Sequence, residues 1–228
     1  MHPILLDLGG LQLSSYWTMA FLGFLVAALG AGRRARSLGL KWSQLLALAI
    51  LSVLAGWGGA RIGGGSGGLA FFGGAALGLP AVAGLLLWYR KPAAFLLDRT
   101  IPFLLLAMAF VRIGCFLQGC CYGVDTTFRW GVALPGENFL RHPVQMYESA
   151  FLLALFAVTV SWRSARPGSV LLTCALFYGA WRFGIGFLRA DEMRNAPFGW
   201  THSQWIGLSV AVLAAPLLIW RLRRRNGR

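Results

Sequence analysis

The sequence predicts an all-α polytopic membrane protein with about seven transmembrane helices. Of the 228 residues, 57% are hydrophobic and only 12% are charged, and the mean hydropathy of +0.65 lies far outside the range of soluble domains. The apolar residues also gather in runs of about 17 residues or more, the length that a helix needs to cross a bilayer. No stretch is polar and long enough to form a separate soluble unit, so we expect a single transmembrane domain over residues 1–228.

Seven apolar runs are the candidate membrane spans. A short lead-in over residues 1–15 precedes the first run, and Pro80 predicts a kink in the third. The predicted spans cover about residues 16–32, 42–59, 74–89, 100–118, 147–162, 169–188 and 204–220.

Two connecting segments differ from ordinary loops. Residues 63–74 are rich in glycine and end at Gly73 and Gly74, which makes them too flexible for a plain helix and too apolar for an exposed loop. We expect a re-entrant or interfacial loop there, because irregular backbone at membrane depth persists only where protein or water satisfies its polar groups. The longest polar stretch, about residues 120–147, predicts a small external head.

The distribution of cations predicts the orientation. The net charge of +14 would suggest nucleic acid in a soluble protein, but here the Lys and Arg residues follow apolar runs and fall on alternate connections, which is the positive-inside pattern. We therefore expect no nucleic-acid partner, an outside N-terminus and a cytoplasmic C-terminus. The four clusters are Arg33, Arg34, Arg36 and Lys41; Arg90, Lys91 and Arg99; Arg163 and Arg166; and Arg221, Arg223, Arg224, Arg225 and Arg228.

Arg112 lies in or near the fourth apolar run, where an ionisable side chain is costly unless it faces a partner, a watery cavity or a ligand. A simpler interpretation is an arginine that extends its head group to the membrane interface. Gly114, Gly119 and Gly123 favour the first interpretation, because they allow the backbone to approach a ligand and to offer N–H groups to an anion. The stretch predicts an anion site at a membrane boundary.

A second set of polar residues lies in the sixth run. Arg182 and Arg189 are seven residues apart, a spacing that places both on one face of a helix. We expect Glu148 to be the partner of Arg182, whereas Arg189 either lines the same cavity or pairs with Glu192 at the surface.

Other residues permit more than one interpretation. His142 is either a structural group or a proton carrier, since the ordinary pKa of histidine lies near neutrality. The four cysteines form neither a disulfide scaffold nor a recognised metal-ligand spacing, so we expect no metal, and their redox state is left open.

Five segments occur together and in order, namely Tyr16, residues 67–74, residues 112–123, residues 141–148 and residues 187–189. On these segments the chain resembles the bacterial phosphatidylglycerol–prolipoprotein diacylglyceryl transferases over nearly its whole length. The resemblance implies a multi-pass enzyme of the bacterial cytoplasmic (inner) membrane. Such an enzyme transfers the diacylglyceryl group of phosphatidylglycerol to the lipobox cysteine thiol of a preprolipoprotein and releases glycerol 1-phosphate, without a cofactor.

The resemblance also assigns roles. Arg112 and Arg189 match essential arginines and would hold the lipid phosphate, and Tyr16 matches a catalytic tyrosine. With His142, these residues are the expected catalytic set. The expected substrate-binding residues are Gly73, Gly74, Arg112, Gly114, Gln118, Gly119, Gly123, Glu148 and Arg182.

Phe72 departs from the family pattern, because many members carry a histidine there that is a candidate base for the thiol. Either the base lies elsewhere, with Tyr16 or His142 the nearest substitutes, or the arginines promote ionisation of the thiol. Two further alternatives stay open. One is a paralogous lipid-headgroup transferase with a different acceptor, and the other is a non-catalytic membrane protein that binds or transports lipid.

Overall fold

The computed structural model describes residues 2–7, 12–62, 68–162, 166–190 and 197–223. Within these ranges it confirms the predicted all-α polytopic membrane fold. The helices are α1 (Ser15–Ser37), α2 (Trp42–Ile62), α3 (Gly68–Trp88), α4 (Ala93–Gln118), α5 (Val144–Val160), α6 (Ser169–Ile185) and α7 (His202–Arg223). Five helical segments are long and apolar enough to cross a membrane, whereas Gly73–Trp88 within α3 and Val144–Val160, which is α5, are shorter apolar stretches.

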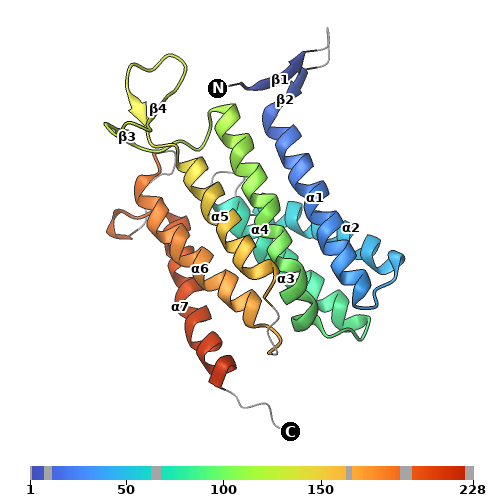
Figure 1. The fold of residues 1–228 in the computed structure, drawn as a ribbon. Helices are drawn as coiled ribbons and strands as arrows, with labels where there is room; N and C mark the ends of the chain where they lie inside the picture. The colour runs from blue at the N-terminus through green and yellow to red at the C-terminus, as the bar shows by residue number, and fades with distance from the viewer. Residues whose placement is uncertain (1, 8–11, 63–67, 163–165, 191–196, 224–228) are drawn as a thin grey trace.

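Short strands and turns lie at one end of the helices, which we call the head end (Figure 1). The predicted lead-in contains β1 (Ile4–Asp7), paired antiparallel with β2 (Gln12–Ser14). The head between α4 and α5 contains a three-stranded sheet in the order β3-β5-β4. Its strands are β3 (Asp125–Thr126), β4 (Val132–Ala133) and β5 (Leu140–Arg141), and two 3₁₀ turns, Gly186–Leu188 and Pro197–Gly199, separate α6 from α7.

The expected glycine-rich loop is shorter than the sequence predicts. Helix α3 begins at Gly68 and continues through Pro80, so Gly73 and Gly74 are helical, whereas residues 63–67 lie outside the described residues. A Cβ atom added at Gly74 would lie 3.0 Å from the carbonyl oxygen of Gly56 in α2. The glycines therefore allow two helix backbones to pack closely, an arrangement common between membrane helices.

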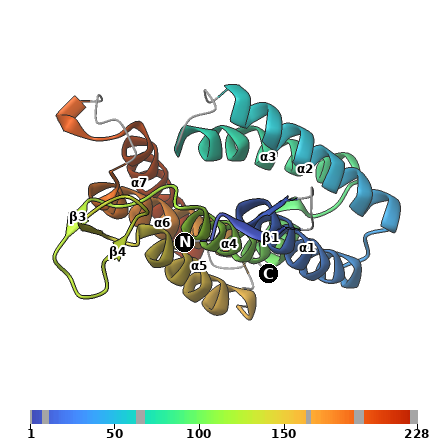
Figure 2. The ribbon, with the colours of Figure 1, turned by 90° about the horizontal axis from the view of Figure 1, so that it is seen from above.

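Helix α4 holds the centre of the structure. It packs against α1 on one side and α5 on the other, and it also contacts α6. Viewed from the head end, α2 and α3 form a separate hairpin beside these helices (Figure 2). The main apolar core lies between α4, α5 and α6 and contains Ile101, Leu105, Ala109, Leu152, Leu155, Val170 and Cys174.

Two kinds of contact fix the position of α4. At the end opposite the head, buried Asp98 accepts hydrogen bonds from the backbone N–H groups of Gly168 (2.7 Å) and Leu171 (2.9 Å), which join the start of α6 to α4. Along α1, Gly23 lies so close to α4 that an added Cβ would stand 2.7 Å from the Cβ of Phe110. Contacts this close leave no room for a side chain.

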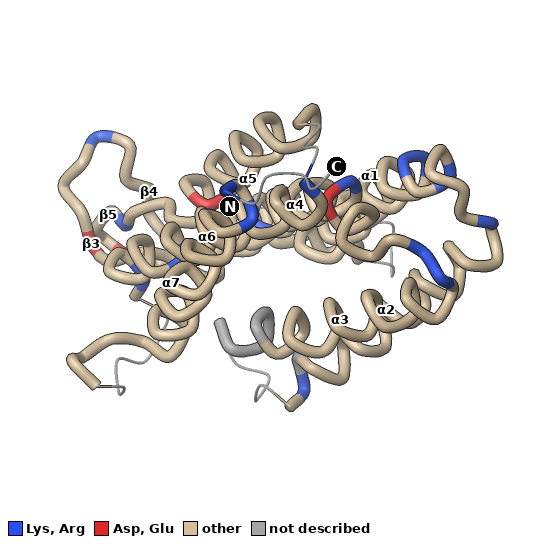
Figure 3. The backbone as a smooth tube through the Cα atoms, turned by 90° about the horizontal axis from the view of Figure 1, so that it is seen from below, with Lys and Arg blue, Asp and Glu red and all other residues tan. Residues whose placement is uncertain are grey.

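The described cations of the predicted clusters lie near the ends of α1, α3 and α7 and near the starts of α4 and α6, which is the end opposite the head, and Figure 3 views the molecule from that end. Lys91 donates a hydrogen bond of 2.8 Å to the carbonyl of Gly39, so the loops after α1 and α3 meet there. Residues that follow four different apolar runs thus share one end of the molecule, as positive-inside patterning requires.

The close α1–α4 packing predicts a position-specific cost. Gly23→Val should lower the free energy of unfolding by about 1–3 kcal/mol through overpacking, whereas Gly32→Val, in the same helix but with open space at its Cβ, should have little effect. Thermal unfolding in detergent measures both. Equal losses in the two variants would contradict the packing explanation, because both variants share the same change in helix propensity.

Candidate active site

Glu148, in the first turns of α5, forms ion pairs with three arginines. Its Oε2 lies 2.9 Å from Nε of Arg112 and 3.4 Å from Nη1 of Arg189, and its Oε1 lies 3.7 Å from Nη1 of Arg182. We call these four residues the arginine cluster. The predicted pairing of Arg182 with Glu148 is confirmed, and Arg112 and Arg189 share the same carboxylate. For Arg189 the expected alternative partner, Glu192, lies outside the described residues.

The arginine cluster is buried unevenly. The side chains of Glu148, Arg182 and Arg189 are each 2% exposed, whereas that of Arg112 is 17% exposed. One carboxylate supplies a single negative charge to three cations, and Arg112 is the member that a ligand can reach from outside. The cluster can therefore attract an anion at Arg112 and hold it with planar guanidinium groups, which suit phosphate oxygens.

Arg189 reaches the cluster by a route that the sequence did not predict. The expectation that Arg182 and Arg189 share a helix face is wrong at Arg189, because α6 ends at Ile185 and a 3₁₀ turn, Gly186–Leu188, follows. Arg189 then has extended backbone, with φ of −85° and ψ of 132°. The chain leaving the helix, and not the helix face, directs this guanidinium to Glu148.

Arg182 is positioned by the contact between α6 and α7. Gly179 and Gly207 face each other at the crossing, where a Cβ added at Gly207 would lie 2.9 Å from the carbonyl oxygen of Gly179. This approach brings the start of α7 to Arg182, whose Nη2 donates a hydrogen bond of 3.0 Å to Oγ of Ser203. The hydroxyl holds the guanidinium in place beside Glu148.

Gly123 joins the head to the arginine cluster. It forms an antiparallel bridge with Arg189, and its N–H donates to the carbonyl of His142 at 3.1 Å. A Cβ added at Gly123 would lie 2.6 Å from Cγ2 of Val144 and 2.7 Å from Cβ of His142. A residue without a side chain is required because three chain segments meet at this point.

Other expected site residues surround the end of α4. The backbone of Tyr16 lies against Gly114, where an added Cβ would stand 3.2 Å from the Tyr16 Cα. Gln118 accepts a hydrogen bond of 3.3 Å from Oγ of Ser14, just before α1. Gly119 ends α4 in the left-handed conformation, with φ of 79°, and its N–H bonds back to Cys115 and Phe116. The structure therefore brings Tyr16, Gly114, Gln118 and Gly119 to the head end of α1 and α4.

His142 and the α2–α3 glycines are placed differently. Nδ1 of His142 lies 3.3 Å from the hydroxyl of Tyr147, and its ring meets the edge of Phe128, so its side-chain contacts are within the head and the first turn of α5. Gly73 and Gly74 contact α2, and no contact joins them to the arginine cluster in the described part of the chain. The side chain of Phe72 lies outside what the structure describes.

Arg141 and Glu137 form a separate ion pair in the head. Arg141 donates from Nη2 to Oε1 of Glu137 at 2.9 Å, and the same carboxylate contacts its Nε. The hydrogen bonds from Arg141 hold the pKa of Glu137 below its usual value. This pair orders the turn between β4 and β5, and it contributes stability at neutral pH that is lost as acid protonates the carboxylate.

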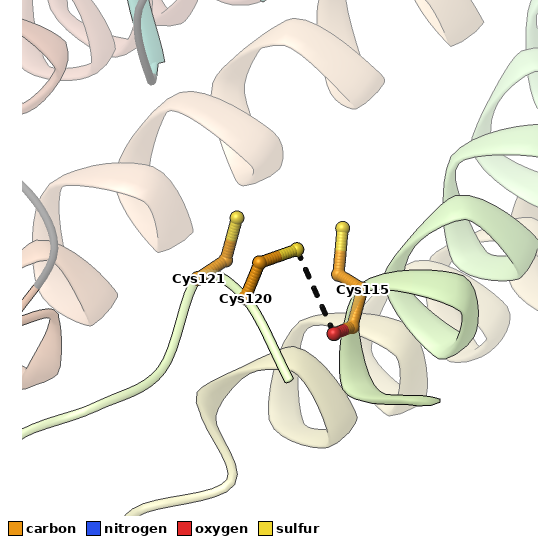
Figure 4. A group of neighbouring side chains, drawn as sticks. All are labelled: Cys115, Cys120 and Cys121. Carbon is orange, nitrogen blue, oxygen red and sulfur yellow. Dashed lines mark hydrogen bonds between the residues drawn. The ribbon is translucent and has the colours of Figure 1, made fainter. Parts of the chain in front are cut away.

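Three thiols meet beside the arginine cluster, a contact that the sequence does not predict. The Sγ atoms of Cys115, Cys120 and Cys121 all lie within 4.8 Å of one another, and all three residues are free thiols (Figure 4). The signal was present as a cysteine at the end of α4 followed by Gly119 and two adjacent cysteines. The spacing of these cysteines matches no common zinc motif, and only the turn after α4 brings their sulfur atoms together.

The fold and the arginine cluster define a polytopic membrane protein with a buried arginine–carboxylate site at the head end of its helices. Residues 65–220 match prolipoprotein diacylglyceryl transferase, and the chain belongs to that family. Phosphatidylglycerol–prolipoprotein diacylglyceryl transferases from two bacteria align with nearly the whole chain. The Clostridium tetani protein is 30% identical, with 93% of this chain and 95% of that protein covered, and the Nitratidesulfovibrio vulgaris (strain DP4) protein is 32% identical, with 98% and 94% covered.

Neutralising the shared carboxylate should destabilise the protein strongly. Glu148→Gln leaves three arginines without their buried anion, and the loss of one partner of a buried ion pair costs about 3–5 kcal/mol. Glu137→Gln removes the same charge from the ion pair in the head and should have a much smaller effect. Thermal unfolding of both variants in detergent tests this, and similar stability of the two would show that Glu148 does not hold the helices together.

Proposed function

We propose that this protein transfers the diacylglyceryl group of phosphatidylglycerol to the lipobox cysteine of a preprolipoprotein signal peptide and releases glycerol 1-phosphate. The observation that carries this proposal is the convergence of three guanidinium groups on one carboxylate, with Arg112 partly exposed. Membership in the family, and relatives named as phosphatidylglycerol–prolipoprotein diacylglyceryl transferases, support it.

The arginines would act on the phosphate of the lipid. The phosphodiester of phosphatidylglycerol carries one negative charge, and it gains a second as the C–O bond to the diacylglyceryl group breaks. The acceptor thiol releases its proton to water, its sulfur forms a thioether bond to the same carbon, and the electrons of the broken C–O bond leave with the phosphate. Arg112 and Arg189 would stabilise this developing charge more strongly than the ground state, which lowers the barrier. Arg182 would keep Glu148 oriented between them.

The remaining site residues would form the surroundings of the phosphate. Gly123 connects Arg189 to the head, so its backbone would position the guanidinium. Tyr16 lies at the start of α1 against Gly114 in α4, and Gln118 and Gly119 end the same helix. We assign Tyr16 a role at the reacting atoms. Gly114, Gln118 and Gly119 would take part in binding substrate. His142 would position the head, because its ring pairs with Tyr147.

The orientation in the membrane follows from the separation of charges. The head end would lie at the outer face of the cytoplasmic membrane, on the side where the preprolipoprotein emerges. The cation-rich end would face the cytoplasm. Phosphatidylglycerol would then enter from the surrounding bilayer with its headgroup at the level of Arg112.

The direct experiment is a reconstituted assay with phosphatidylglycerol and a lipobox peptide. We expect a thioether-linked diglyceride on the peptide cysteine and glycerol 1-phosphate in equal amounts, and no product from the same peptide with serine in place of cysteine. A folded, reconstituted protein that forms no thioether would overturn the proposed function.

Lysine should not replace arginine at the cluster. A guanidinium can grip two phosphate oxygens at once, so Arg112→Lys and Arg189→Lys should lower transfer, and the alanine variants should lose about 3 kcal/mol of transition-state stabilisation, roughly a hundredfold in rate. The matched control is Arg36→Lys, because Arg36 lies over the ring of Trp42 at the end opposite the head. Near-normal turnover in folded Arg112→Ala and Arg189→Ala protein would leave these arginines as structural groups.

The orientation can be tested with reporter fusions. Alkaline phosphatase should be active when inserted after Gly136 in the head and inactive after Arg36 or Arg225, because phosphatase folds only outside the cytoplasm. Activity after either arginine would reverse the proposed topology.

A further inference from the structure

The thiols of Cys115, Cys120 and Cys121, which we call the thiol cluster, form a group of donors beside the arginine cluster that the proposed mechanism does not use. Cys115 belongs to the last turns of α4, three residues after Arg112, and its side chain is buried, whereas Cys120 and Cys121 are partly exposed. Tyr122, next to Cys121, accepts a hydrogen bond from the N–H of Ala190, which follows Arg189. The thiol cluster therefore lies between the chain segments that carry Arg112 and Arg189.

The backbone is shaped to bring the three sulfur atoms together. Gly119 ends α4, and the N–H of Cys120 bonds back to the carbonyl of Cys115 at 3.1 Å. Cys121 then adopts a positive φ of 60°, which is unfavourable for a residue with a side chain. Gln145 in α5 fixes the turn by donating a hydrogen bond of 2.6 Å to the carbonyl of Cys120. Unfavourable backbone that is held by its surroundings often marks a functional site.

The donor set fits one chemical class of ligand. Three thiols are soft ligands, which select zinc or monovalent copper over the hard cations magnesium and calcium. Zinc binds sulfur at about 2.3 Å, so ligands in tetrahedral geometry stand about 3.8 Å apart, and sulfur atoms already within 4.8 Å need only small side-chain movements. Three protein ligands leave the fourth position of a tetrahedral zinc ion open for another ligand.

The neighbouring cations stabilise a negatively charged metal–thiolate site. Zn²⁺ with three thiolates carries one net negative charge, and the cation of Arg112 lies one helical turn from Cys115. The positive charge of Arg112 therefore stabilises the negatively charged zinc–thiolate group. A fourth thiolate adds a second negative charge beside the same arginines.

We propose that the thiol cluster binds one Zn²⁺ and that the open fourth position of this zinc takes the thiol of the acceptor peptide as a thiolate. The inference rests on the proposed function for the identity of the acceptor. On coordination the thiol releases its proton to water, because a metal-bound thiol is deprotonated. The sulfur then attacks the diacylglyceryl carbon, the C–O bond breaks toward the phosphate held by the arginines, and the neutral thioether leaves zinc, since thioethers bind it weakly.

Cobalt binding tests the site without relying on activity. Reduced, detergent-solubilised protein freed of metal should bind one Co²⁺ per chain and show sulfur-to-cobalt charge-transfer absorption with the visible bands of tetrahedral cobalt. Cys115→Ser, Cys120→Ser and Cys121→Ser should each lose about a third of the charge-transfer intensity or all binding, because each removes one of three ligands. Cys174→Ser, which changes a buried cysteine in the core of α6, should keep the full spectrum.

The acceptor position has its own readout. Adding the lipobox peptide to the cobalt-loaded protein, in the absence of lipid, should raise the charge-transfer intensity by about a third as a fourth sulfur binds. The peptide with serine in place of cysteine should leave the spectrum unchanged. Equal spectra with both peptides would overturn the proposal.

Three results from metal-binding measurements would also overturn the proposal. In the first, the reduced protein does not bind one cobalt ion per chain. In the second, Cys174→Ser loses as much cobalt binding as the cluster variants do. In the third, the purified protein contains copper and not zinc. Removal of zinc should lower transfer about a hundredfold, comparable to the loss of a general base. If zinc removal leaves transfer unchanged, the zinc proposal alone is contradicted. If the zinc-loaded protein shows no transfer, the proposed function is contradicted.

Discussion

The carboxylate of Glu148 is the contact on which the head end of the structure depends. It joins α5 to Arg112 in α4, to Arg182 in α6 and to Arg189 in the segment after α6. A buried charge is costly without a partner, so any movement that separates one of these elements leaves a buried ion with fewer partners. The close glycine contacts between α1 and α4 and between α6 and α7 hold the same helices near enough for the ion pairs to form. Packing and electrostatics therefore specify one arrangement together.

The same contact explains why a site of this kind can bind an anion. Among the described residues Glu148 forms ion pairs with three arginines, and the most exposed of them, Arg112, lies in the last turns of α4 near the head end. Under the proposed function, the phosphate of the lipid would bind at Arg112. Because Glu148 and Ser203 already orient the guanidinium groups, little reorganisation would be needed as charge develops on a bound phosphate.

The sequence predicted the elements better than the connections between them. Apolar runs located every helix, since their length and composition reflect the bilayer, and the cost of a charge at membrane depth identified Arg112, Arg182 and their partner Glu148. Helical spacing failed at Arg189, because the helix ends at Ile185 and a later turn directs the side chain. The bridge between Gly123 and Arg189 and the meeting of three thiols depend on contacts and turn conformations that no periodic pattern encodes. The prediction of a loop up to Gly74 was wrong for a related reason. Gly73 and Gly74 permit close helix packing as readily as they permit a loop.

The central claim is that the arginine cluster recognises the phosphate of the donor lipid, and lipid-dependent thermal stability tests it most directly. Purified protein in detergent should unfold at a higher temperature with phosphatidylglycerol than with a diacylglycerol of the same acyl chains, because only the first carries a phosphate. Arg112→Ala protein should lose this difference while keeping its response to the acyl chains. Equal stabilisation by the two lipids, or a difference that persists in Arg112→Ala protein, would show that the cluster does not bind the phosphate.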